Sequence, residues 1–122
     1  MKGQVSLEYL LISAVALVML SLSAAALLNI KEYSEESREL FKFRSSAIAL
    51  ANAADEVCSL GNGNQRTVVL HSRMAVDWDG AIIISNKTSV IRDIPCEVMP
   101  EDGLEGVVTV KNNNGIVKIR EQ

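Results

Sequence analysis

Residues 9–30 read YLLISAVALVMLSLSAAALLNI, and this uncharged stretch decides the fold of the chain. Leu, Ile, Val, Ala and Met dominate it, and the polar residues Ser13, Ser21 and Ser23 interrupt it. About 20 apolar residues in a helix span the roughly 30 Å hydrocarbon core of a bilayer. A buried helix of a soluble domain normally carries a polar stripe, which this stretch lacks. We therefore predict a membrane-compatible helix over these residues.

A conventional secretory signal, cut behind its apolar region, is the alternative. Such a signal has a shorter apolar region that is followed by a small-residue cleavage site. Ala24, Ala25 and Ala26 imitate such a site, but the apolar run continues through Leu28 and Ile30. The length of the run therefore favours a helix that stays in the mature protein.

A short polar segment precedes the apolar run. It consists of Met1-Lys2-Gly3 followed by Gln4-Val5-Ser6-Leu7-Glu8-Tyr9. Glycine has no side chain and adopts many backbone conformations, so Gly3 leaves the chain free to be extended at this point. We predict Ser6 as a helix N-cap or a first-turn residue, with Glu8 placed where the helix dipole favours negative charge.

This segment resembles the class III signal peptide of archaeal type IV pilin-like proteins, in which Q-x-S-x-E-Y follows a Lys-Gly or similar leader end. The resemblance implies cleavage between Gly3 and Gln4 by a membrane-embedded, prepilin-peptidase-like aspartic protease. Such a cut lies before the apolar run and leaves the helix in the mature protein. The recognition motif that it implies comprises Lys2, Gly3, Gln4, Ser6, Glu8 and Tyr9.

Glu8 lies at the edge of the apolar run, where an unpaired charge is costly. One interpretation is that its carboxylate reaches the cytoplasmic headgroups. The resemblance implies another, because in type IV pilins the matching glutamate pairs with the new N-terminal amine of a neighbouring subunit, here the amine of Gln4. An N-terminal glutamine can also cyclise, which would leave Glu8 hydrogen-bonded or neutral.

The helix is expected to continue beyond the apolar run, because residues 4–60 contain neither Gly nor Pro. Gly61-Asn62-Gly63-Asn64 is typical of a helix C-terminus, so we predict one helix from about Ser6 to Leu60. Its second half carries apolar residues every three or four positions, as on a helix face that packs against a core. These residues are Leu40, Phe43, Ala47, Leu50, Ala51, Ala54, Val57 and Cys58.

Beyond residue 64, short β-rich runs bounded by turn residues predict five strands. They are Arg66–Ser72, Gly80–Ser85, Thr88–Ile94, Gly106–Lys111 and Ile116–Glu121. A turn at Asn86-Lys87 would pair Ile83 with Val90.

Two registers are open to the last hairpin. A two-residue Asn114-Gly115 loop would set Lys111 opposite Lys118. A four-residue loop, Asn112–Gly115, sets Val110 opposite Val117 instead and separates the lysines, so we predict the longer loop.

The predicted fold is α+β, a long N-terminal hydrophobic and amphipathic helix packed on a small antiparallel β-sheet head, similar to type IV pilins. The domains expected are a leader peptide (residues 1–3), a hydrophobic helix (4–30), its amphipathic continuation (31–60) and a β-rich head (61–122). A head of about 60 residues has little core, so a disulfide between Cys58 and Cys96 is expected outside the cytoplasm, against the alternative of two free thiols.

The remaining polar residues favour structural roles. Asn86-Lys87-Thr88 is the one N-x-S/T sequon, so Asn86 is a candidate glycosylation site. Asp77 and Asp79 read as a turn, although calcium is an alternative if Glu101, Asp102 and Glu105 converge on them. His71 is the only histidine and has no recognisable catalytic partner; no metal, cofactor or enzymatic motif is evident. Twelve basic against fifteen acidic residues and no basic tract argue against nucleic-acid binding.

These observations, with the resemblance, predict a structural subunit of an archaeal type IV pilus-like filament used for surface attachment. The partners implied are other pilins, further copies of the chain, a prepilin-peptidase-like protease, and an assembly ATPase with its membrane platform. Before assembly the subunit would span the membrane once with its N-terminus in the cytoplasm and its head outside. After assembly it would lie in a surface filament. A membrane-anchored binding module or a minor pilin or adhesin is the alternative; an archaellum subunit and a small secreted enzyme are less favoured.

Overall fold

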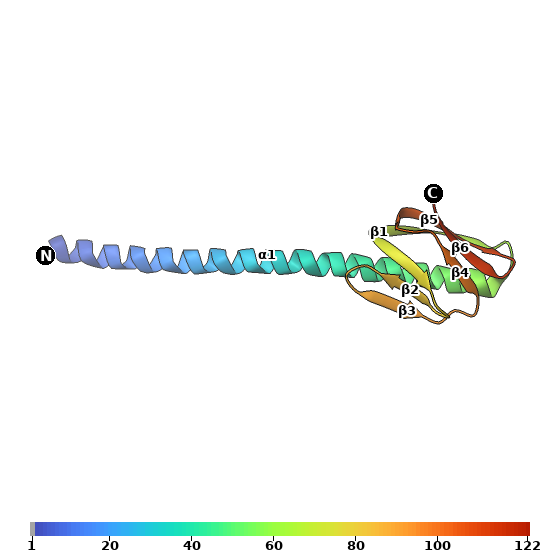
Figure 1. The fold of residues 1–122 in the computed structure, drawn as a ribbon. Helices are drawn as coiled ribbons and strands as arrows, with labels where there is room; N and C mark the ends of the chain where they lie inside the picture. The colour runs from blue at the N-terminus through green and yellow to red at the C-terminus, as the bar shows by residue number, and fades with distance from the viewer. Residues whose placement is uncertain (1) are drawn as a thin grey trace. The chain divides into compact units, whose positions relative to one another are not determined.

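The computed structural model describes residues 2–122, so Met1 of the expected leader lies outside the described residues. Two compact units, Met1–Ser37 and Arg38–Gln122, are described separately below. The first unit consists of the N-terminal part of one helix, α1 (Lys2–Leu60). The second contains the rest of α1 and six strands (Figure 1): β1 (Gln65–Trp78), β2 (Ile82–Ser85), β3 (Ser89–Arg92), β4 (Glu97–Pro100), β5 (Leu104–Asn113) and β6 (Ile116–Glu121).

The second unit packs a helix segment on a curled sheet, which confirms the predicted α+β fold. The strand order is β3-β2-β1-β5-β6-β4. Four of the neighbouring pairs are antiparallel, and β4 pairs with β6 in parallel. The expectation of an antiparallel sheet therefore needs one correction, because β4 was not predicted. The proline that ends this four-residue strand cannot donate a ladder hydrogen bond, so it is tolerated only at an edge, where β4 lies.

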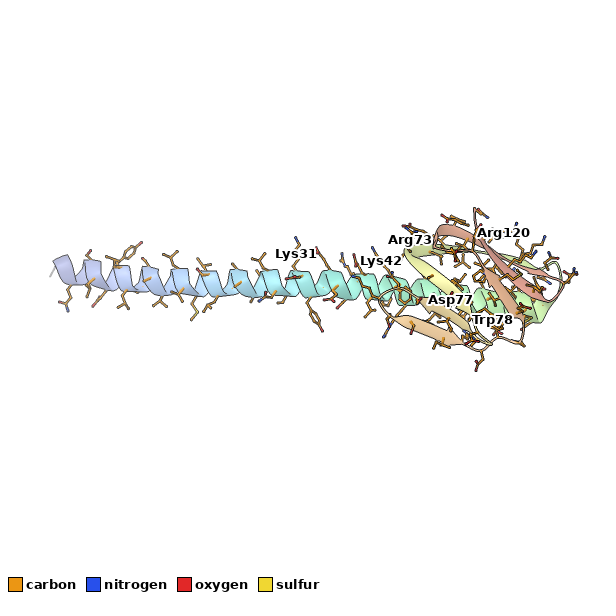
Figure 2. All side chains as sticks on the ribbon, in the orientation of Figure 1. Lys31, Lys42, Arg73, Asp77, Trp78 and Arg120 are labelled. Atoms are coloured by element: carbon orange, nitrogen blue, oxygen red, sulfur yellow. A yellow bond between two sulfur atoms is a disulfide. The ribbon has the colours of Figure 1, made fainter. Side chains whose placement is uncertain are left out.

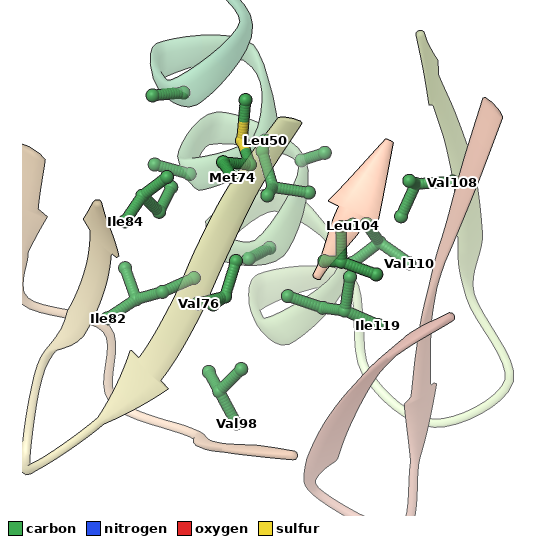
Figure 3. Close-up of a cluster of buried hydrophobic side chains, with 14 of the residues drawn as sticks. Leu50, Met74, Val76, Ile82, Ile84, Val98, Leu104, Val108, Val110 and Ile119 are labelled. Atoms are coloured by element: carbon green, nitrogen blue, oxygen red, sulfur yellow. The ribbon is translucent and has the colours of Figure 1, made fainter. Parts of the chain in front are cut away.

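The core of this unit lies between α1 and the concave side of the sheet. Leu50 of α1 is fully buried among side chains from several strands, including Met74, Ile84 and Ile119 (Figure 3). The predicted helix stripe is confirmed from Phe43 to Val57, while Leu40 remains 40% exposed. Large aliphatic side chains on the strands face small alanines on the helix, which lets the sheet approach the helix closely.

Strand β1 divides its length between two partners. Gln65–Leu70 pairs with β5, and Ala75–Trp78 pairs with β2. The register of the β1–β5 ladder shifts between Leu70 and Met74, and in this interval the backbone N–H of His71 donates to Ser46 Oγ at 3.0 Å. Because Ser46 is buried on α1, this hydrogen bond joins the bend of the sheet to the helix.

The register predicted for the β5–β6 hairpin is wrong. The loop is the two-residue turn Asn114-Gly115, and Lys111 lies directly opposite Lys118. Both turn residues have positive φ, 56° for Asn114 and 84° for Gly115, as a type I′ turn requires. The two lysines lie on the outer side of the sheet. Their repulsion therefore destabilises the hairpin less than the turn and the burial of Asn112 stabilise it.

The β2–β3 hairpin also differs from its predicted register, by one residue. Its loop has three residues, Asn86–Thr88, so Val90 lies opposite Ile84 rather than Ile83. The backbone N–H of Asn86 closes this loop on the carbonyl of Thr88 at 2.9 Å. Side chains alternate between the faces of a strand, so this register brings Val90 to the core side with buried Ile84.

The C-terminal end of α1 is fastened by polar contacts and by a disulfide. Asn64 Nδ2 donates to the carbonyls of Leu60 and Gly61, which the helix itself leaves unpaired. The predicted Cys58–Cys96 disulfide is confirmed, with a Cα–Cα distance of 5.9 Å. It ties the last turn of the helix to the segment between β3 and β4.

Arg66 adds an ion pair between the start of β1 and the helix. Its Nη2 lies 2.6 Å from Glu56 Oε1. The hydrogen bond from Arg66 lowers the pKa of Glu56 below its ordinary 4.5 and raises that of Arg66. The stabilisation is therefore present above pH 4.5 and is lost as the pH falls through the lowered pKa. Both side chains are about half exposed, so this contribution is small.

Asn112 is the buried polar residue on which the hairpin depends. Its Nδ2 donates to the carbonyl of Val57 at 2.9 Å, and its Oδ1 accepts from the N–H of Gly115 at 2.9 Å. We expect Asn112→Ala to lower the free energy of unfolding by about 1–3 kcal/mol, because the buried carbonyl of Val57 loses this donor and the turn loses its bond to Gly115.

Urea unfolding of the full chain in detergent, followed by near-UV circular dichroism of Trp78, measures this change. Asn113→Ala is the matched control, since Asn113 is exposed on the same strand. Equal stability of the two variants would contradict the role of Asn112.

Candidate functional site: the N-terminal helical segment

The predicted recognition residues from Gly3 to Tyr9 all lie within α1. Gln4 and Glu8 are four residues apart and therefore lie on the same face, one turn from each other. Ser6 is neither an N-cap nor a first-turn residue in this chain, so that prediction is wrong. The helix begins at Lys2, because nothing in Lys2-Gly3-Gln4 ends it, and Ser6 falls in its second turn.

The helix segment that follows is covered by apolar side chains on all sides (Figure 2). All fifteen large apolar side chains from Val5 to Ile30 are at least 52% exposed within the chain. Burying one such side chain stabilises by about 1.5–3 kcal/mol, so leaving the set in water would cost on the order of 20–40 kcal/mol. That exceeds the roughly 5–15 kcal/mol by which a folded domain is stable. This surface therefore requires lipid or other protein around it.

The serines inside the segment satisfy their own hydroxyl groups. Ser13, Ser21 and Ser23 each donate from Oγ to the backbone carbonyl four residues earlier, at 2.9 Å in every case. A hydroxyl left without a partner in hydrocarbon would cost several kcal/mol. These three bonds remove that cost, so the polar interruptions do not prevent the segment from lying in an apolar environment. Sequence reasoning treated the serines only as interruptions, although their spacing inside a helix is enough to predict the bonds.

Residues 2–122 contain one helix that is long and apolar enough to cross a membrane. In the most apolar 18-residue stretch of this helix, none of the residues is buried against the rest of the chain. The core helix of a soluble protein passes the same length test but is mostly buried. Exposure on every side therefore separates this helix from that class.

Glu8 and Gly3 mark the polar end of this segment. Glu8 is exposed, and among the described side chains from Gly3 onward it has no ion-pair partner. The chain next to Gly3 is open, since a Cβ built there meets no atom within 4 Å. A side chain at position 3 is thus compatible with the fold, and any requirement for glycine there arises from another molecule.

The other candidate residues lie in the second unit. Asn86 is exposed in the β2–β3 loop, where its Nδ2 donates to Arg73 O at 2.9 Å and to Ser72 Oγ at 3.2 Å. The structure does not bring Asp77 and Asp79 together with the other acidic residues into a group that could hold a metal ion within residues 2–122. His71 is exposed on β1, and its backbone N–H rather than its ring makes the contact with Ser46.

Comparison with known families identifies one segment of the chain. Residues 2–27 match the model of the class III signal peptide family. Neither the curated proteins nor the solved structures compared with the chain give a match. The match covers the polar start, with Gly3, Gln4 and Glu8, and most of the apolar run behind it. Residues 2–27 are therefore a class III signal peptide, the archaeal type IV pilin-like signal that the sequence predicts.

Proposed function

We propose that the chain is the structural subunit of an archaeal type IV pilus-like filament used for surface attachment. The single observation that carries this proposal is a class III signal joined to an exposed membrane-length helix. These two features fit a membrane-anchored, type IV pilin-like protein. A filament gives the apolar surface a second place away from water, because the helices of neighbouring copies cover it after it leaves the lipid.

The processing step follows from the position of the signal. In this proposal residues 1–3 form the leader, and a prepilin-peptidase-like protease cuts between Gly3 and Gln4. Residues 4–30 span the membrane before assembly and lie in the filament core afterwards; residues 31–60 continue the helix, and residues 61–122 form the head. An assembly ATPase with its membrane platform then adds the subunit to other pilins.

The cut also changes the start of α1. If the mature chain begins at Gln4, Ser6 moves into the first turn, and Glu8 lies one turn from the new amine. A carboxylate is favoured near a helix N-terminus, where backbone N–H groups are unpaired. The proposed partner of Glu8 is the Gln4 amine of a neighbouring copy, because an anion and a cation that both leave water need each other.

Gly3→Val tests the processing step without disturbing the fold. We expect the unchanged chain to begin at Gln4 in material sheared from the cell surface. We expect Gly3→Val to accumulate uncut in the membrane, because the β-branched side chain obstructs the protease cleft, while the open surroundings of position 3 accept it.

N-terminal sequencing and intact mass measure both results, and intact mass also detects a cyclised Gln4. Leu7→Val is the matched control, because it introduces a β-branched side chain away from the Gly3–Gln4 bond that the protease cuts. Soluble, monomeric wild-type chains that begin beyond Ala26 would contradict the proposal, since they would lack the helix.

We further propose that Asn86 carries a glycan, because it is exposed in a loop that faces the cell exterior in this topology. The sugar would bond to Nδ2, which would leave one N–H for Arg73 O and Ser72 Oγ. We expect the mature wild-type mass to exceed that calculated for residues 4–122, and the mass of Asn86→Gln to equal that calculated for its own unmodified sequence. A wild-type mass equal to the bare chain would contradict modification.

A further inference from the structure

The outer side of the β5–β6 hairpin collects three cations, Lys111, Lys118 and Arg120, which we call the cationic face. The hairpin register sets Lys111 opposite Lys118, and Arg120 follows two residues later on the same side of β6. Arg120 lies on the side of the hairpin away from α1 (Figure 2). These residues, with Thr109 and Asn113, line a shallow depression of about 190 Å³. A second depression of about 270 Å³ adjoins it through Lys118 and Arg120 and extends to Met99 on β4.

Within residues 2–122 the cationic face lacks compensation by ion pairs. The ion pairs of this part of the chain involve Arg66, Lys87 and Arg92 instead. Glu101 borders the second depression and its Oε2 accepts the backbone N–H of Glu121 at 3.0 Å, but among the described residues it forms no ion pair with Lys118 or Arg120. Like charges set directly opposite on a sheet destabilise it, so the chain accepts a cost here that an anionic partner would remove.

The first unit carries an exposed set of opposite charge. Glu35 and Glu36 follow Glu32 by three and four residues on α1, so both are neighbours of Glu32 on the helix surface; we call the three residues the acidic stripe. Carboxylates at this spacing repel one another by a few tenths of a kcal/mol. Among the described ion pairs, the next glutamate, Glu39, binds Lys87 at 3.5 Å, while the stripe itself has no partner.

We propose that the cationic face of one copy binds the acidic stripe of another copy during assembly. This inference rests on the proposed function, and it names a contact between subunits outside the apolar helix. Each set has three members, and their spacings are similar: directly opposite cross-strand neighbours place their Cβ atoms about 4.5–5.5 Å apart, and helix neighbours one turn apart place theirs about 5–6 Å apart. Each set relieves the repulsion within the other. The contact also fixes how far one copy is shifted along its neighbour, which a uniformly apolar helix surface cannot do.

A charge-reversal set tests the contact in the full-length chain. Lys111→Glu/Lys118→Glu reverses the face, Glu35→Lys/Glu36→Lys reverses the stripe, and a fourfold variant combines them. We expect each double variant to lower the filament yield at least tenfold and the fourfold variant to restore it. Lys42→Glu/Arg44→Glu is the control, since it changes the charge equally at exposed positions on α1. Near-UV circular dichroism checks that every variant is folded.

A second readout does not depend on filaments. Carbodiimide links a carboxylate to an amine only when the two groups are in contact. We therefore treat with carbodiimide an equal mixture of 15N-labelled and unlabelled chains in the same membranes. We expect linked peptides that join the stripe to Lys111 or Lys118, with mixed labels. We expect them to become several-fold fewer in 0.5 M salt, because exposed ion pairs are screened.

Each outcome has a defined meaning. Rescue by the fourfold variant together with mixed-label links supports the contact between copies. Links with a single label only, or double variants that assemble as the wild type does, overturn it. The proposal is also overturned if Lys111→Glu/Lys118→Glu assembles as well as the wild type but no longer binds heparin, a sulfated polysaccharide. That result would assign the face to an external polyanion. If the wild type forms no filaments, the proposed function fails while the crosslinks still decide this inference.

Discussion

Glu8→Ala is expected to remove the chain from sheared surface filaments, even in molecules that begin at Gln4, while leaving its head fold unchanged. In the proposed filament, the Gln4 amine of each copy lies beside Glu8 of a neighbour in an apolar core. Without the carboxylate, the amine must enter that core unpaired or lose its proton. We expect each subunit contact to weaken at least tenfold, equivalent to about 1.4 kcal/mol or more. Because a filament repeats this contact at every subunit, incorporation falls below detection.

The comparison of several variants isolates the charge at this position. Glu8→Gln keeps the size and loses the charge, so it should fail as alanine does, whereas Glu8→Asp should assemble partially. Glu105→Ala removes an exposed carboxylate from the head and should assemble normally. N-terminal sequencing of the membrane fraction establishes that each variant begins at Gln4. Normal filaments of correctly cut Glu8→Ala would favour the headgroup interpretation of Glu8, or a binding module that never polymerises.

Cys58→Ser/Cys96→Ser is expected to have the largest effect on stability. The disulfide closes a loop with a sequence separation of 38 residues, and on the chain-entropy model it stabilises the head by about 4 kcal/mol. For a folded unit of this size, that loss lowers the melting temperature by roughly 15–30 °C. The effect is large because Arg38–Gln122 is a small unit whose core is built chiefly of aliphatic side chains and alanines.

Thermal unfolding of the full chain in detergent measures this loss. The wild type treated with reductant provides a second route to the same state and should agree with the double variant. Alkylation before and after reduction establishes the redox state of Cys58 and Cys96 in the cell. A change in melting temperature of less than a few degrees, with the native thiols fully alkylated, would contradict a stabilising disulfide.

The parts of the fold that depend on long patterns could be predicted from the sequence. The helix follows from the absence of Gly and Pro over residues 4–60, and its end follows from Gly61-Asn62-Gly63-Asn64. The buried stripe around Leu50 follows from helical periodicity. The disulfide was predicted for a physical reason, since a small exported head benefits from a covalent link.

The hairpin registers could not be predicted in the same way. Repulsion between Lys111 and Lys118 favours the longer loop, but both side chains lie on the outer side of the sheet, where water weakens the repulsion. The opposing contribution comes from Asn112, whose burial against the Val57 carbonyl depends on contacts distant in sequence. Strand β4 has only four residues and ends in Pro100, so its sequence lacks a recognisable strand pattern. It forms a strand because it pairs with β6.

The candidate site shows the same division. Gly3, Gln4 and Glu8 could be recognised because the class III signal peptide is a linear pattern, and residues 2–27 match its family model. The N-cap role predicted for Ser6 was wrong, because the helix already includes Lys2, Gly3 and Gln4. Cleavage, pairing of Glu8 and glycosylation of Asn86 stay predictions, since each one involves a second molecule.

The hydroxyl groups of Ser13, Ser21 and Ser23 have a consequence for reversibility. Each remains bonded to its own backbone whether acyl chains or another helix lie beside it. In the proposed assembly, a helix that leaves the bilayer, or returns to it, therefore exchanges no hydrogen-bond partners at these positions. These three bonds oppose neither insertion nor extraction, so they suit a helix that passes between lipid and protein in both directions.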